Sequence, residues 1–294
     1  MAIVAPASPF DRETFDRGVA EIERLGLTPT ITEGVFARRG YVAGDAAGRA
    51  EALTKAWCDP SVAAVMAARG GYGSAQLLPL LDTAVIREVN KPFIGHSDLT
   101  ALLVYLTTLC DQVCFHGPMV VNMACGEAGY DRDSFRRCLM SSAPIGELAA
   151  AGLESCRPGE ASGPLLGGTL TQLVASLGTP FAFSPPDGYV LLLDEIGERP
   201  YRIDRMLTQL TASGVLARAA AVVCGEFPDC DEPSAPPTAR GVVADLLEAF
   251  PGPVLFGCPT GHTAGPALTV PLGVGVRVVG GPRPRVVVTE SAVS

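Results

Sequence analysis

The sequence predicts an α/β protein with two domains. In the first half, short apolar segments typical of buried strands alternate with longer segments whose apolar residues recur every three or four positions, as in amphipathic helices. The chain has 294 residues, which is more than one hydrophobic core usually serves. Near the middle, a stretch rich in Ala, Gly, Pro and Ser interrupts this pattern. Together these observations indicate two α/β units joined by a connection.

Residues 1–142 are expected to form a parallel-sheet domain of the Rossmann or flavodoxin type. The strands that we expect cover residues 3–4, 28–32, 62–66, 92–94 and 113–115. The helices that we expect cover residues 11–25, 46–57 and 74–81, and one more begins behind Ser97. Strands that alternate with helices in this way predict a mostly parallel sheet with helices on both faces.

Residues 143–163 are expected to be the connection, and residues 164–294 a smaller, strand-rich, mixed α/β domain. A Gly-Gly turn and helix at 167–177 should open this domain. Further helices are expected at 201–213 and 238–250. Strands are expected at 189–193, 219–223, 253–256, 275–279 and 285–289.

Charge and cysteine usage narrow the functional class. The net charge of -9 and the absence of a basic cluster argue against nucleic acid or an anionic membrane surface as a partner. The N-terminus lacks the basic region of a signal peptide. Nine scattered cysteines without a CxxC pair fit reduced thiols rather than a zinc site. We therefore expect a cytoplasmic protein without a metal or cofactor.

Residues 93–100 (FIGHSDLT) are the strongest candidate for chemistry. A short apolar run leads through a glycine to Ser97, and an amphipathic helix follows at once. This layout exposes a hydroxyl at the carboxyl edge of a parallel sheet, beside the N–H donors of a helix start. The alternative is an ordinary turn in which Ser97 or Asp98 caps the helix.

A glycine-rich turn at 69–73 (RGGYG) follows the preceding strand. Adjacent turns of a parallel sheet lie on one edge, so this turn can face Ser97. Its glycines, Gly70 and Gly71, could form an oxyanion hole together with the N–H of Asp98. An ordinary tight turn is the alternative.

The base for a serine nucleophile should be one of three histidines. His96 directly precedes Ser97, so the two side chains should point in different directions. His116 follows a strand and could be either the base or a histidine with a purely structural role. His262 lies in a polar, glycine-flanked loop and is our candidate. Asp194 and Glu195 end an apolar strand, where a carboxylate can orient a histidine; a solvated acidic turn is the alternative.

Four further residues are candidates for substrate binding. Arg202 and Arg205 (in YRIDR) are neighbours on one face of an expected helix and could bind a carboxylate; a salt-bridged helix surface is the favoured alternative. Arg69 and Tyr72 of the glycine-rich turn complete this set.

Together these motifs resemble the LD-carboxypeptidases, serine peptidases of the S66 type that include the microcin C immunity peptidases. The motifs are GHSD, RGGYG, FHGPM, LLGGTL, LLLDEIGERPYRIDRML and GHT, and their order and spacing match from IVAPASPF near the N-terminus to VPLG at 270–273. The resemblance implies a Ser–His–Glu triad with Ser97 as nucleophile and His262 as base.

Three positions depart from the family pattern. The family usually has Leu-Glu-Asp where this chain has Leu193, Asp194 and Glu195. By register Asp194 takes the catalytic place, and we favour it over Glu195. Thr169 stands where Asn is common, and His96 where an aromatic residue is common; neither is expected to touch the triad.

The resemblance implies hydrolysis of the amide between an L-configured diamino acid and the terminal D-alanine of a muropeptide tetrapeptide, in murein recycling. The triad would be split between the domains, and a homodimer could help to fix their arrangement. A microcin C-type immunity peptidase, or another acyl-amide hydrolase with the same triad, is the alternative. A non-enzymatic alternative is a two-lobed small-molecule binding protein, which the Ser–acid–His order argues against.

Overall fold

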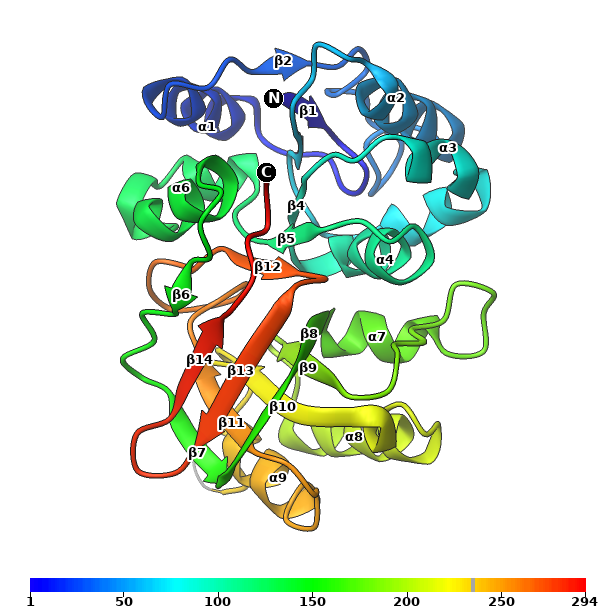
Figure 1. Ribbon diagram of the computed structural model, residues 1–294. Coiled ribbons are helices and arrows are strands. Elements are labelled where there is room, and N and C mark those ends of the chain that lie inside the picture. Colours follow the sequence, from blue (N-terminus) through cyan, green and yellow to red (C-terminus); the bar gives the residue numbers. More distant parts are fainter. Residues whose placement is uncertain (234–235) are drawn as a thin grey trace.

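The first half of the chain is built on a six-stranded sheet in the order β12-β5-β4-β3-β1-β2 (Figure 1). The computed structural model describes residues 1–233 and 236–294. The strands are β1 (Ala2–Val4), β2 (Thr30–Ile31), β3 (Val65–Ala67), β4 (Phe93–Gly95), β5 (Cys114–His116) and β12 (Val270–Leu272). β1 to β5 are parallel, and β12 runs antiparallel to β5 at the edge.

Helices cover both faces of this sheet. In Figure 1, α1 and α6 lie on one side and α2, α3 and α4 on the other. The helices are α1 (Arg12–Arg24), α2 (Ala46–Cys58), α3 (Thr83–Glu88), α4 (Thr100–Val104), α5 (Val120–Met123) and α6 (Arg132–Met140). The doubly wound parallel arrangement predicted from the sequence is therefore confirmed.

The second sheet has eight strands in the order β6-β14-β13-β8-β9-β10-β11-β7. The strands are β6 (Gly146–Glu147), β7 (Glu154–Arg157), β8 (Gly159–Thr169), β9 (Tyr189–Asp194), β10 (Ala219–Gly225), β11 (Val254–Cys258), β13 (Gly275–Gly280) and β14 (Arg285–Val288). The central strands β8 to β11 are parallel, and the flanking pairs are antiparallel. The helices are α7 (Leu170–Ser176), α8 (Pro200–Ala212) and α9 (Ala239–Leu246).

The segment expected to connect the domains, 143–163, contains β6, β7 and the start of β8, all paired in the second sheet. β8 was not predicted from the sequence because it contains several glycines, and glycine is unfavourable in a strand. A Cβ at Gly163 would lie 2.0 Å from the carbonyl oxygen of Gly188, and one at Gly167 would lie 2.1 Å from that of Leu192. These glycines allow neighbouring backbones to approach, so 167–169 belong to a strand rather than to the expected turn.

Side chains of β9 alternate between two hydrophobic cores. Val190 and Leu192 pack into the core that includes the first sheet. Leu191 and Leu193 pack into the core beneath α7, α8 and α9. Because successive strand residues point to opposite faces, this alternation fixes the direction of the residues that follow Leu193.

Candidate active site

Ser97 lies on a sharp turn at the end of β4. Its backbone has a φ of 65°, a left-handed conformation that is unfavourable for any residue with a Cβ. A short 3-10 turn (Ser97–Leu99) follows and leads into α4. The strained turn lifts the partly exposed side chain away from the sheet edge, whereas His96 and Asp98 on either side are buried.

The imidazole of His262 lies between Ser97 and Asp194. Its Nε2 is 3.2 Å from Ser97 Oγ, and its Nδ1 is 2.7 Å from Asp194 Oδ2. The backbone N–H of His262 donates to the other carboxylate oxygen, Oδ1, at 3.1 Å. A serine hydroxyl, an imidazole and a carboxylate are thus joined in a chain of hydrogen bonds across the two sheets.

The surroundings of His262 make its imidazole a stronger base. Burial alone would lower its pKa, but the hydrogen bond and the negative charge of Asp194 outweigh burial and raise the pKa of His262 above its ordinary value. The Asp194 side chain is 0% exposed, so water does not screen its charge.

The alternation of β9 separates Asp194 from Glu195. Asp194 continues the face of Val190 and Leu192 and so points toward the first sheet and His262. Glu195 continues the face of Leu191 and Leu193 and accepts hydrogen bonds from Thr171 at the start of α7, from its N–H at 2.9 Å and its hydroxyl at 2.7 Å. Burial raises the pKa of Glu195, and the bonds from Thr171 oppose that rise.

The glycine-rich turn packs directly on Ser97. A Cβ at Gly70 would lie 3.1 Å from Ser97 Cβ, and one at Gly71 would lie 2.5 Å from Ser8 Oγ. The N–H of Ser74 donates to the Asp98 carboxylate at 2.9 Å, which ties the end of the turn to the nucleophile segment. Of the residues expected to form an oxyanion hole, Gly70 therefore lies against Ser97 and Asp98 follows it directly, whereas Gly71 packs against Ser8.

A buried arginine of α2 holds the same turn from behind. Arg49 is 4% exposed, and its Nη1 donates to the carbonyl oxygens of Gly73, at 2.8 Å, and Pro6, at 2.5 Å. Its Nη2 donates to Gln76 Oε1 at 2.6 Å. Sequence reasoning missed Arg49, because nothing in a helical pattern marks an arginine as buried.

The expected substrate-binding residues bond to their own surroundings. Arg69 donates to the carbonyl of Pro9 at 2.8 Å. Arg202 donates to Glu198 at 3.3 Å and to the hydroxyl of Tyr201 at 3.1 Å. The guanidinium of Arg205 lies over the Tyr201 ring, and exposed Tyr72 packs edge-to-face against Tyr41. In the described chain, none of these hydrogen bonds reaches Ser97, His262 or Asp194.

The expectation that Thr169 and His96 stay clear of the triad residues is wrong. The hydroxyl of Thr169 donates to Asp194 Oδ2 at 3.4 Å. The ring of His96 packs edge-to-face against that of His262 at a centroid distance of 5.1 Å, and its Nδ1 bonds the carbonyl of Gly117 at 2.9 Å. Proximity in the fold, which spacing along the chain does not reveal, brings both to the site.

Glu226, which holds the loop that carries His262, was not predicted from the sequence. Glu226 directly follows β10 and accepts hydrogen bonds from the hydroxyl of Thr263 and from the N–H of Ala264, the latter at 3.1 Å. A glutamate at the end of an apolar strand was the available signal, as it was for Asp194 and Glu195.

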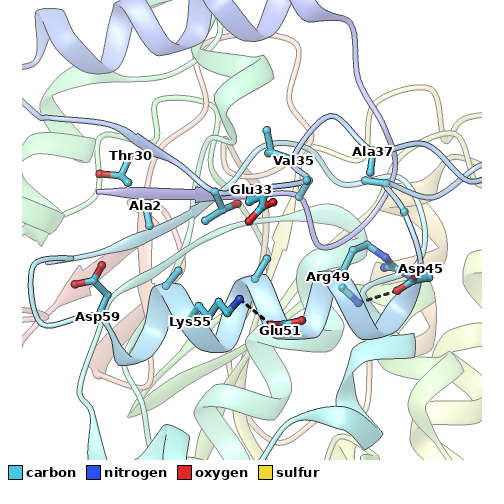
Figure 2. A pocket seen from close by; sticks show the side chains of 18 of the residues that line it. Ala2, Thr30, Glu33, Val35, Ala37, Asp45, Arg49, Glu51, Lys55 and Asp59 are labelled. Atoms are coloured by element: carbon cyan, nitrogen blue, oxygen red, sulfur yellow. Dashed lines mark hydrogen bonds and ion pairs between the residues drawn. The ribbon is translucent and has the colours of Figure 1, made fainter.

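A cavity of about 530 Å³ lies away from this constellation (Figure 2). It is bounded by β1, β2, the loop behind β2 and α2, and small side chains line much of it. Ser97, Asp194 and His262 are not among its lining residues. We place the chemistry at the hydrogen-bonded residues rather than at this cavity, because it lacks a nucleophile paired with a base.

Comparison with known proteins agrees with the fold. Residues 1–117 match the LD-carboxypeptidase N-terminal domain, and residues 162–278 match the LD-carboxypeptidase C-terminal domain. A protein of Streptomyces coelicolor that carries the name of a carboxypeptidase is 37% identical over 93% of this chain and 88% of its own. The murein tetrapeptide carboxypeptidase of Pseudomonas aeruginosa is 30% identical over 90% of this chain and 88% of its own.

Solved structures extend the likeness to the whole fold. The muramoyltetrapeptide carboxypeptidase of Oxalobacter formigenes has a TM-score of 0.86 and 28% identity, with 98% of both chains covered. Fold and relatives define a serine-type carboxypeptidase. The chain belongs to the LD-carboxypeptidase family, which confirms the resemblance drawn from its motifs.

Proposed function

We propose that the protein hydrolyses the amide between an L-configured diamino acid and the terminal D-alanine of murein tetrapeptides, with Ser97, His262 and Asp194 as its triad. The observation that carries this proposal is the continuous hydrogen-bonded path from Ser97 Oγ through the His262 ring to Asp194 Oδ2. The names of the relatives from Pseudomonas aeruginosa and Oxalobacter formigenes support the choice of substrate.

In the proposed first step, His262 Nε2 takes the hydroxyl proton while Ser97 Oγ attacks the scissile carbonyl carbon. Asp194 holds the proton on Nδ1, so that Nε2 is free to accept. The tetrahedral oxyanion would be stabilised by backbone N–H groups of Asp98 and of the Gly70–Gly71 turn. These groups are preorganised, because the turn is packed against Ser97 and tied to Asp98.

Collapse of this intermediate expels D-alanine as His262 returns the proton to the leaving nitrogen. Ser97 then carries the remaining peptide as an ester. Water activated by His262 hydrolyses this ester and restores the hydroxyl. The path joins Ser97, at the end of β4 in the first sheet, to Asp194, at the end of β9 in the second sheet, through His262 in the loop after β11. We therefore propose that activity depends on how the two sheets are packed against each other.

The decisive experiment follows D-alanine release from a defined muropeptide tetrapeptide by mass spectrometry. We expect wild-type protein to yield the tripeptide and folded Ser97→Ala to yield none. Wild-type turnover in Ser97→Ala would refute the nucleophile assignment.

A microcin-type immunity activity is the second candidate, because the Escherichia coli microcin C7 self-immunity protein is 26% identical over 92% of this chain. A parallel assay with an aminoacyl sulfamoyl nucleoside separates the two. If the acyl-enzyme forms faster with that compound than with the muropeptide, the result would favour the microcin-type immunity activity.

Location and assembly follow as further proposals. Among the residues that the structure describes, no helix is both long and apolar enough to cross a membrane. The free thiols, six of which are buried in the described chain, fit a reducing compartment, and we propose that the protein acts on recycled murein peptides in the cytoplasm. We further propose that the first domain ends at residue 142, where the segment that pairs into the second sheet begins, and that a homodimer holds the domains in place. Light scattering tests the homodimer.

A further inference from the structure

The imidazole of His116 lies beside the Asp194 carboxylate. His116 ends β5 and is 0% exposed. Its Nε2 is 3.8 Å from Asp194 Oδ2, the oxygen that binds His262 Nδ1. Within the described chain, this nitrogen has no hydrogen-bond partner. A buried polar atom without a partner is costly, so its position against a catalytic carboxylate demands a reason.

The other ring nitrogen of His116 identifies where the proton sits. Thr260 Oγ1 donates its hydrogen to the carbonyl of Leu268 at 2.9 Å. It can therefore only accept from His116 Nδ1, which lies 3.1 Å away. With the hydroxyl oriented in this way, a neutral His116 ring carries its proton on Nδ1, and the nitrogen that faces Asp194 is bare. Burial lowers the pKa of His116 to about 3, so the ring is neutral.

His116 lies between the part of the site on the first sheet, which carries Ser97, and the part on the second sheet, which carries Asp194. It pairs with Gly95 across the parallel strands β4 and β5, so the same sheet edge carries His116 and Ser97. Asp194 ends β9 of the second sheet, and Thr260 lies in the loop that follows β11 of that sheet. At Gly261, whose φ is +69°, a Cβ would lie 2.4 Å from His116 Cε1 and 2.5 Å from Asp194 Oδ2, so the three groups are in close contact.

We propose that His116 is a positioning residue that fixes the Asp194 carboxylate and keeps water from it, in a tautomer that Thr260 selects so that no hydrogen bond is donated to Asp194. The inference rests on the proposed triad. A donor at Nε2 would compete with His262 for Oδ2 and would weaken the pull of the carboxylate on the imidazole. The bare nitrogen fills the space and leaves the charge directed at His262.

Several titratable groups face this contact and bear on its pH dependence. His96 and His262 act on His116 directly, and Cys258 interacts with Asp194. Glu195 acts on His262, and Glu226 acts on Cys258. Burial lowers the pKa of His96 to about 4 and raises the pKa of Cys258 to about 12. Both are therefore neutral at pH 7, and changes near neutrality should report His262 itself.

Nitrogen NMR of the histidines tests the tautomer in the wild-type protein without any activity measurement. The chain has three histidines, and His96→Phe identifies one signal by its loss. We expect His116 to carry its proton on Nδ1 at pH 7 and to remain neutral down to pH 5. A proton on Nε2, or a charged ring at pH 6, would overturn the proposal. This result stands even if the substrate assignment fails.

Kinetics test the consequence. Thr260→Val removes the acceptor and frees the ring to donate to Asp194; we expect kcat/KM to fall on the order of tenfold and its acid limb to move to lower pH. Thr260→Ser should retain wild-type behaviour. Thr269→Val is the matched control, since the Thr269 hydroxyl is buried and has no partner in the described chain. A slower Thr260→Val enzyme with an unmoved acid limb would leave His116 a purely structural role and refute the proposal.

Discussion

His262 binds the Asp194 carboxylate at both oxygens, through its ring Nδ1 at 2.7 Å and its own backbone N–H at 3.1 Å. The two bonds fix the loop and the ring together, so the imidazole has little freedom to rotate away from Ser97. A shorter acid than the family's usual glutamate can serve in this arrangement, because the backbone of His262 is held against it. The distance from His262 to Ser97 is thus set by a contact between the end of a strand and a loop rather than by side-chain length.

Removal of the charge on Asp194 should cost far more rate than removal of the charge on Glu195. Asp194→Asn should lower kcat/KM about 10³–10⁴-fold, because the amide no longer holds His262 in the required tautomer. Glu195→Gln should stay within about fivefold, since Glu195 bonds Thr171, and should mainly cost about 1–2 kcal/mol of stability. Steady-state kinetics and urea unfolding measure both. Equal, mild losses of rate would mean that neither acid orients His262.

The pH profile of kcat/KM should report His262. The base must be neutral, and Asp194 raises the pKa of His262, so activity should fall as the pH drops through this raised value. In Asp194→Asn the residual activity should persist to lower pH, because the charge that raises the pKa is gone. If the acid limb stays at the same pH in Asp194→Asn, the limb reports the titration of a group other than His262.

A substitution that relieves the backbone strain at Ser97 should stabilise the protein. Ser97 has a φ of 65°, and glycine adopts this conformation without a Cβ penalty. Ser97→Gly should be inactive yet about 1 kcal/mol more stable than Ser97→Ala, which keeps the strain. Urea unfolding of the two variants measures the difference. Equal stabilities would show that the turn costs the fold nothing.

The buried Arg49 should be essential to both the fold and the glycine-rich turn. Arg49→Met leaves carbonyl groups of Pro6 and Gly73 without their donor and should cost about 3 kcal/mol. It should also slow catalysis by loosening the turn against Ser97. Arg17→Met is the control: Arg17 is 53% exposed and pairs with Glu13, so its loss should cost less than about 0.5 kcal/mol. Wild-type kinetics in folded Arg49→Met would show that Arg49 does not control the position of the glycine-rich turn.

Two buried neutral histidines should weaken the fold in acid. Burial lowers the pKa of His96 to about 4 and that of His116 to about 3, whereas the unfolded chain takes up protons near pH 6.5. The unfolded state therefore binds more protons below pH 6.5. Each histidine should then remove about 1.4 kcal/mol of stability per pH unit between about pH 6 and its folded pKa.

His96→Phe isolates one of these contributions. The slope of unfolding free energy against pH should be shallower by about 1.4 kcal/mol per unit around pH 5 than in the wild type. His262 does not disturb this window, because its raised pKa leaves it protonated in both states there. Identical slopes in the two proteins would mean that His96 is already charged in the folded state.

Much of the fold followed from periodicity. Strands β1, β3, β4 and β5 and helices α1 and α2 lie within a few residues of their predicted places, because short apolar runs and amphipathic spacing are local signals. β8 and β12 were missed for opposite reasons: β8 carries glycines that local rules exclude from strands, and β12 is a three-residue edge strand whose partner, β5, is more than 150 residues away in the chain. Only the assembled sheets reveal why each segment is extended.

By itself, the sequence determined the chemistry available to this protein. It supplies a serine between a strand and a helix, three histidines, and two acids at a strand end, in the order of one peptidase family. The tertiary structure alone decided which of them meet. The alternation of β9 sends Asp194 toward His262 and Glu195 toward α7. Pairing of β8 with β9 places Thr169 beside the Asp194 carboxylate, and packing of one sheet against the other brings His116 to it, with Thr260 bonded to His116. Such contacts depend on strand direction and on distant backbone, which no local pattern encodes.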